Sequence, residues 1–343
     1  MSVSNQFTTP GARPHHTPVH RYPLPPEGRQ FRPTYSGGRY KLPDPDTGRD
    51  TLFTRVTTGA HALEDTSSLD RWKMGNVVLG LKDQPELLDS LDLFADPADV
   101  RKNVRRVADK ASQVAGADQA SELGTAIHAW TEAVERDGVA VDDVPGKFRP
   151  YIEAYLHTLS AAGVSTVPDM VERIVYSSTT GWVGTLDRIY QLADGTQVIG
   201  DVKTSKTLDF SYLSFATQLA CYATADYMLS LDGTQWEPMP AVGDVYGVIA
   251  HVPSNQPGHC ELVTMDLRVG MQALELAYAV IQARRVSKVD VVNTWELPRP
   301  MDYAALRAKV LECTTAPQLA QLWEDHQDIW TDDLTQLGYS RLS

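Results

Sequence analysis

Two runs of β-forming residues, separated by Asp194-Gly195, constrain the fold of this chain more than any other feature. The first run extends from Trp182 to Leu192, and the second runs through Val198-Ile199 to Lys203. Asp-Gly is a strong turn signal, because glycine takes a positive φ without steric cost. The sequence therefore predicts a β-hairpin.

This hairpin carries one aspartate on each strand, Asp187 on the first and Asp201 on the second. Side chains at positions i and i+2 of a strand point to the same face, so Asp201 and Lys203 should emerge together while Val202 turns into the core. Two carboxylates and an ammonium group are costly to bury at the end of an apolar hairpin unless a cation holds them together. We therefore predict a metal site there.

Length and charge limit the class of protein. The chain has 343 residues, of which 42% are hydrophobic and 22% charged, which is typical of globular proteins with one or two domains. The 31 Lys and Arg residues against 44 Asp and Glu residues give a formal charge of −13. This charge argues against a protein that coats nucleic acid non-specifically, but it allows a local basic patch or a bound cation to grip phosphate.

The cysteines limit which cofactors the protein can bind, and the lack of long apolar runs limits where in the cell we expect it. Cys221, Cys260 and Cys313 are scattered and form no C-x-x-C pair, so we expect reduced thiols and neither an iron–sulfur cluster nor a four-cysteine zinc site. No run approaches the length of a membrane span, and the N-terminus lacks the apolar core of a signal peptide. We expect a cytoplasmic protein without a membrane partner.

Composition and periodicity divide the chain into four regions. A Pro- and His-rich arm, extended and mostly disordered, is followed by a hairpin with helices, by an α/β core, and by a helical extension; their bounds are 1–37, 38–162, 163–292 and 293–343. Within these regions we predict a hairpin over 40–58, a helix over 117–136, a strand over 171–176, a helix over 211–229, strands over 244–252 and 261–267, and a helix over 270–285.

Several polar side chains near the hairpin have two interpretations each. His128 and Glu132 lie on one side of their helix, four residues apart. Both are metal ligands in one interpretation; in the other, His128 is a structural residue and Glu132 a solvated one. Glu172 either faces the site or pairs with a nearby arginine. Lys206 and Arg188, close to the aspartates, either bind phosphate or are solvated.

Four short motifs occur in a fixed order along the chain. They are G-x-x-x-H at Gly124–His128, G-x-x-D at Gly184–Asp187, D-x-K at Asp201–Lys203 and Q-x-x-x-Y at Gln218–Tyr222. In this order, with the D-x-K after an apolar strand, the series resembles the RecB-type branch of the PD-(D/E)XK nuclease superfamily, which includes CRISPR-associated and phage recombination exonucleases. The similarity covers about residues 120–230, and residues 35–115 resemble actinobacteriophage exonucleases more loosely.

The resemblance implies a fold and a site. The fold is an α/β core of restriction-endonuclease type, with a mixed central sheet flanked by helices. The implied metal ligands are His128, Asp187, Asp201 and the carbonyl of Val202; Lys203 would orient or deprotonate water, and Gln218 and Tyr222 would contact the substrate backbone or support the site. Oxygen ligands with one imidazole suit Mg²⁺ or Mn²⁺, and Mn²⁺ tolerates nitrogen better.

The function implied by the resemblance is a metal-dependent DNA exonuclease of phage recombination or DNA end processing. Its expected partners are DNA and a recombination protein such as a single-strand annealing protein, in the host cytoplasm if a phage encodes it. No phosphate-loop motif of a helicase is present, so the nuclease would act without its own motor. Two alternatives stay open: a structure-specific endonuclease, and a non-catalytic DNA-binding protein that keeps the fold.

Overall fold

The computed structural model describes residues 22–26, 28, 31–291 and 301–342, and the chain divides into two compact units, Met1–Arg285 and Val286–Ser343. The larger unit contains the helices α1 (Val56–Ala60), α2 (Ser67–Asp83), α3 (Pro97–Val114), α4 (Gln119–Arg136), α5 (Arg149–Ala161), α6 (Tyr212–Ala223) and α7 (Leu267–Ala283). Its strands are β1 (Thr34–Ser36), β2 (Arg39–Pro43), β3 (Asp50–Arg55), β4 (Ser165–Ser177), β5 (Trp182–Gln191), β6 (Gln197–Lys203), β7 (Tyr227–Leu229), β8 (Trp236–Pro238), β9 (Tyr246–His251) and β10 (Glu261–Asp266).

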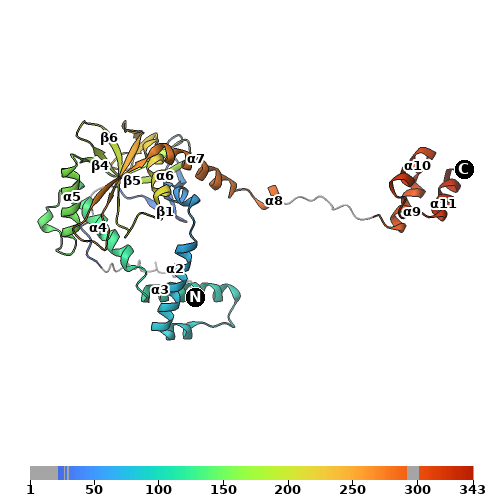
Figure 1. Ribbon diagram of the computed structural model, residues 1–343, viewed down its shortest axis with the longest axis horizontal. Helices are drawn as coiled ribbons and strands as arrows, with labels where there is room; N and C mark the ends of the chain where they lie inside the picture. The colour runs from blue at the N-terminus through green and yellow to red at the C-terminus, as the bar shows by residue number, and fades with distance from the viewer. Residues whose placement is uncertain (1–21, 27, 29–30, 292–300, 343) are drawn as a thin grey trace, which may run out of the picture. The chain divides into compact units, whose positions relative to one another are not determined.

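The described strands of this unit form one mixed ten-stranded sheet (Figure 1). The pairs β3–β5 and β6–β9 are parallel, and all other described pairs are antiparallel. The strand β5 is central, because it pairs with β4 along one edge and with both β3 and β6 along the other. The predicted α/β class, with a mixed sheet and flanking helices, is confirmed.

Helices cover both faces of the sheet (Figure 1). On one face, α1, α6 and α7 bury Leu186, Ile199 and Ile249. On the other face, α4 and α5 bury Val198 and Val202. The alternation along β6 thus sends Ile199 and Asp201 to the side of α6, as the two-residue period of a strand requires.

The predicted hairpin is present as β5 and β6, with Gln191 opposite Gln197. Asp194 Oδ1 accepts a hydrogen bond of 2.9 Å from the backbone N–H of Thr196, and Gly195 takes a φ of 86°. Both features stabilise the tight turn that the Asp-Gly pair predicted.

The N-terminal arm differs from the prediction within its described part. Residues 34–36 form β1, and the rings of Tyr22 and Phe148 pack edge to face with centroids 6.0 Å apart. In addition, Trp130 Nε1 donates a 3.1 Å hydrogen bond to the carbonyl of Pro23. The described residues of the arm are therefore ordered against the core by aromatic contacts; residues 1–21, 27 and 29–30, on which the rest of the prediction falls, lie outside the described residues.

The predicted helix over 211–229 is wrong in its last third. The helix α6 ends at Ala223, and Tyr227–Leu229 instead form β7, which pairs with the edge of β4. Met228 and Leu229 are apolar enough for either structure, so pairing with a distant strand decided between them. Among the described residues, no helix combines the length and apolarity needed to cross a membrane.

The smaller unit contains α8 (Lys288–Val291), α9 (Tyr303–Glu312), α10 (Ala316–Asp325) and α11 (Asp332–Leu342). The last three bury a small core of their own, made by Leu306, Val310, Cys313, Leu319 and Leu334. The unit begins at Val286, earlier than the predicted boundary at residue 293; residues 292–300 lie outside the described part of the chain.

Candidate functional site

A fork in the sheet creates the candidate site. The strand β5 pairs with β3 at Trp182 and Val183, but its pairing with β6 starts only at Arg188. The edge of β5 between these points faces a cavity of about 380 Å³. The predicted residues that line this cavity are His128, Asp187, Asp201, Val202, Lys203, Gln218 and Tyr222.

The fork depends on close approaches at two glycines. A Cβ atom on Gly184 would lie 2.5 Å from Cε1 of Tyr222, so only glycine lets that ring pack against β5. A Cβ atom on Gly124 would lie 2.4 Å from Oγ1 of Thr204, which directly follows β6. The glycines of the G-x-x-D and G-x-x-x-H motifs thus bring α4 and α6 close to the strands that carry the aspartates.

A hydrogen bond between Asp187 on β5 and Val202 on β6 connects the two strands where they separate. Asp187 Oδ2 accepts a 2.9 Å hydrogen bond from the backbone N–H of Val202, and the same oxygen lies 3.4 Å from Nε2 of His128. The backbone of Val202 therefore lies beside the carboxylate and the imidazole, while its side chain is 2% exposed in the core under α4 and α5.

Asp201 is held between an ammonium group and an amide. Its Oδ2 lies 2.6 Å from Lys203 Nζ, an ion pair rather than a well-aligned hydrogen bond. Its Oδ1 accepts a 3.2 Å hydrogen bond from Gln218 Nε2, and Gln218 lies 3.3 Å from the hydroxyl of Tyr222. Gln218 and Tyr222 are 8% and 1% exposed, so they support Asp201 from within the core and offer little surface to a substrate.

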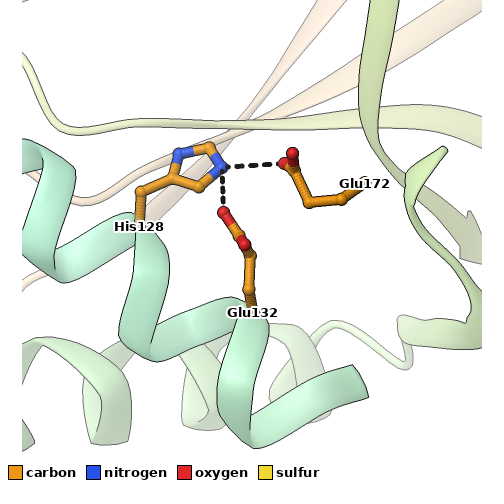
Figure 2. Close-up of side chains that lie close together, drawn as sticks. All are labelled: His128, Glu132 and Glu172. Carbon is orange, nitrogen blue, oxygen red and sulfur yellow. Dashed lines mark hydrogen bonds and ion pairs between the residues drawn. The ribbon is translucent and has the colours of Figure 1, made fainter. Parts of the chain in front are cut away.

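Two glutamates complete a second group of ligand atoms around His128 (Figure 2). Nε2 of His128 lies 3.3 Å from an oxygen of Glu132 on the same helix and 3.3 Å from an oxygen of Glu172 on β4. Neither glutamate is a solvated surface residue, since their side chains are only 19% and 25% exposed. The interpretation of Glu172 as a residue that faces the site is the one that the structure supports.

Glu172 reaches the site through an unusual backbone conformation. It has a φ of 55°, in the left-handed region, and it follows an irregularity in the register of β4 between Thr166 and Val171. A residue other than glycine is strained there, and such strain is typical of functional sites. The bulge re-aims the side chain toward His128.

The charges of the site shift the pKa values of its members. Burial opposes protonation of His128, but the carboxylate of Asp187 outweighs it and raises the pKa of His128 to about 9. Burial raises the pKa of Glu132 to about 7, and burial together with Asp187 raises that of Asp201 to about 6. Burial disfavours the charged form of Lys203, yet Asp201 raises its pKa above the ordinary value.

The donor set fits a divalent cation. Four carboxylates converge on one imidazole and one ammonium group: those of Glu132, Glu172, Asp187 and Asp201. Two guanidinium groups lie at the edge of this cluster, Arg136 at 3.6 Å from Glu132 and Arg188 at 3.9 Å from Asp187. The fit to a metal therefore rests on the donor types, because oxygen donors with a single nitrogen suit Mn²⁺ or Mg²⁺. His128 belongs to both possible ligand sets, one with the two aspartates and one with the two glutamates.

Two predicted phosphate ligands lie elsewhere. Arg188 is 0% exposed, forms a 2.7 Å ion pair with Glu135 and donates a 2.7 Å hydrogen bond to Thr131, so its guanidinium is already paired within the protein and offers no exposed surface to a phosphate. Its guanidinium lies in the layer under α4, where Nη1 is also 3.9 Å from Oδ2 of Asp187. Lys206 is exposed on the loop after β6 and does not line the cavity.

The cavity also contains residues that the sequence did not connect with the site. Tyr35, Tyr40 and Arg55 come from the N-terminal strands, and β3 reaches the cavity through its parallel pairing with β5. The hairpin over 40–58 was predicted, but no local pattern places it beside a strand so distant in the sequence. No protein-family model matches this chain, and a search of curated proteins finds no relative for it.

Proposed function

We propose that this chain is a divalent-metal-dependent nuclease of the PD-(D/E)XK type that hydrolyses DNA phosphodiester bonds, and that it acts as an exonuclease in recombination or end processing. The observation that carries the proposal is the convergence of His128, Asp187, Asp201 and Lys203 in one cavity from three elements. The four motifs, in their order, support the same reaction.

The metal would be held by Asp187 and Asp201 with His128, and the nearby glutamates Glu132 and Glu172 would complete or extend this set. A bound Mg²⁺ or Mn²⁺ supplies a Lewis acid for the phosphate oxygens and lowers the pKa of bound water. The protein holds the carboxylates ready for this role through Gln218, which donates to Asp201, and through the N–H of Val202, which donates to Asp187.

Lys203 contributes a positive charge to the site from the protein, in addition to that of a bound metal. Because its pKa is raised, the ammonium group keeps its proton at neutral pH. It therefore offsets the negative charge that develops on the phosphate oxygens and orients water, and it does not act as the base. Its Nζ also lies 5.0 Å from the centre of the Phe215 ring, which restricts the side chain.

Digestion of DNA tests the proposal. The wild-type protein and the Asp201→Asn variant are incubated with end-labelled linear duplex, linear single-stranded DNA and closed circular DNA, in Mg²⁺, Mn²⁺ or EDTA. Asp244→Asn, on the exposed loop before β9, is the matched control for loss of a carboxylate. Removal of a metal ligand from such a site should lower the rate by at least about a hundredfold, whereas the control should keep full activity.

The substrates separate the alternatives. Cleavage of linear DNA alone identifies an exonuclease, and cleavage of circular DNA identifies an endonuclease. DNA binding that needs metal but gives no product would favour a non-catalytic DNA-binding protein. Equal digestion by the wild type and by Asp201→Asn would refute the proposed site.

A further inference from the structure

Arg55 lines the candidate cavity from β3, the strand that pairs with the start of β5. It is the last residue of β3 and lies beside Val183 in the parallel pair β3–β5, close to the fork that exposes Asp187. Its guanidinium carbon lies 5.6 Å from the ring centre of Tyr35 and 5.9 Å from that of Tyr40. Two aromatic rings therefore hold the cation in place.

The ring of Tyr40 is fixed, whereas Tyr35 on the edge strand β1 is 53% exposed. Tyr40 is 3% exposed, and its hydroxyl lies 2.8 Å from Oγ1 of Thr185 on β5. The rings of Tyr35 and Tyr40 are in contact, with centroids 5.0 Å apart. Arg55 thus packs against one fixed ring, that of Tyr40, which reduces the side-chain freedom that Arg55 would lose when it binds a ligand.

The positive charge of Arg55 has no protein counter-ion among the described residues. Within that part of the chain, no carboxylate lies within ion-pair distance of its guanidinium, and Nε is buried without a hydrogen-bond partner. This differs from the other buried arginine near the site, Arg188, which pairs with Glu135 at 2.7 Å. A half-buried guanidinium is costly unless an anion pairs with it.

The chemistry of the cavity indicates which anion is missing. A guanidinium offers a planar fork of N–H donors that matches two oxygens of a phosphate group, and arginine is preferred over lysine wherever such paired recognition matters. In this cavity Arg55 and Lys203 are both cations, while His128 and the carboxylates form the metal-binding side.

We propose that Arg55, which packs beside the rings of Tyr35 and Tyr40, binds the non-bridging oxygens of a phosphate group of the DNA strand that enters the cavity. The substrate class follows from the proposed function and therefore rests on it; the anion site follows from the unpaired guanidinium. Arg55 acts by binding and positioning the phosphate, and the carboxylates and Lys203 remain responsible for hydrolysis.

DNA binding without hydrolysis tests the anion site separately from catalysis. The probe is a fluorescein-labelled hairpin DNA with a single-stranded tail, titrated in Ca²⁺ and followed by fluorescence anisotropy. The proteins are the wild type, Arg55→Gln, Arg55→Lys and Arg49→Ala. Arg49 lies on the same N-terminal hairpin, is exposed and does not line the cavity, so it controls for the loss of one positive charge.

Arg55→Gln should weaken binding about tenfold to a hundredfold, as expected for loss of a charge-assisted hydrogen bond. Arg55→Lys should recover part of the affinity, because it keeps the charge but not the planar fork. Arg49→Ala should bind like the wild type. Circular dichroism checks that each variant is folded.

Equal affinity of Arg55→Gln and the wild type would overturn the anion site, and so would equal losses for Arg55→Gln and Arg49→Ala. A wild type that binds the DNA through Arg55 but cleaves no DNA in Mg²⁺ or Mn²⁺ would refute the nuclease and leave the anion site intact. If the wild type cleaves DNA and Arg55→Gln has the same kcat/KM, the anion site is refuted and the nuclease stands. A wild type that does not bind the DNA would refute the proposal for Arg55.

Discussion

Replacement of Arg188 by methionine should strongly destabilise the larger unit, because this arginine is fully buried and ion-paired. Its guanidinium donates to Glu135 and to Thr131, at 2.7 Å in both cases. The carboxylate of Glu135 also accepts hydrogen bonds from the hydroxyls of Tyr155 and Thr166. Among the described residues, Arg188 is the cation that pairs with this buried carboxylate.

The magnitude follows from burial. Arg188 and Glu135 have side chains that are 0% and 6% exposed, so water cannot replace a lost partner. Removal of one member of a buried ion pair costs about 3–5 kcal/mol, because the other charge stays buried without compensation. That is a large share of the 5–15 kcal/mol by which domains are typically stable.

Urea unfolding followed by tryptophan fluorescence measures the effect. Arg188→Met should lower the urea midpoint by at least about 1 M, whereas Arg268→Ala should cost less than about 1 kcal/mol. Arg268 is the control, because its 2.8 Å pair with Asp266 is largely exposed. The double variant Arg188→Met/Glu135→Leu should recover most of the loss, since it removes both buried charges.

Three results would show that this reasoning is wrong. If Arg188→Met is no more destabilised than Arg268→Ala, Glu135 is not buried as the structure has it. If the double variant is as unstable as the sum of its single variants, the two charges do not interact. If Arg188→Met unfolds normally and loses only DNA affinity, Arg188 binds phosphate, which is one of its two interpretations from the sequence.

Three further predictions concern the cavity. Gly184→Ala should destabilise the protein by about 1–3 kcal/mol, because its Cβ would lie 2.5 Å from Cε1 of Tyr222; thermal unfolding checks this, and an unchanged Tm would contradict the close packing at the fork. Folding raises the pKa of His128 from 6.5 to about 9. In EDTA, protonated His128 should therefore contribute at most about 3 kcal/mol to the free energy of unfolding. This contribution is fully present below pH 6.5 and is lost as the pH rises through about 9. Thermal unfolding between pH 6 and 10 should then show a fall that His128→Gln lacks, and parallel curves would exclude the effect. Glu172→Gln should weaken Mn²⁺ binding about tenfold in calorimetry if the glutamate belongs to the ligand set, whereas unchanged affinity would assign the metal to the aspartates alone.

Local sequence patterns determined the elements that depend on neighbouring residues. The hairpin β5–β6 follows from two β-rich runs around Asp194-Gly195, and α3 starts at Pro97 with Asp96 accepting a 2.9 Å hydrogen bond from the N–H of Ala98. These structures need only short-range geometry: a positive φ at glycine and a fixed φ at proline. The end of α6 could not be found in this way, because pairing with β4 made a strand of Tyr227–Leu229.

The sequence by itself also selected His128, Asp187, Asp201 and Lys203 as candidates, because their residue types and spacing suit a metal site. Only the tertiary structure decided how such residues are used. The bulge before Glu172 turned that side chain toward His128, and contacts with Glu135 and Thr131 buried the guanidinium of Arg188 under α4.

The parallel pairing of β3 with β5 brought Arg55 to the cavity from a hairpin far away in the sequence. The physical reason is the range of the interactions. Turns, caps and strand alternation act within a few residues, whereas the fork in the sheet and its charges arise from contacts between strands that only the folded chain brings together.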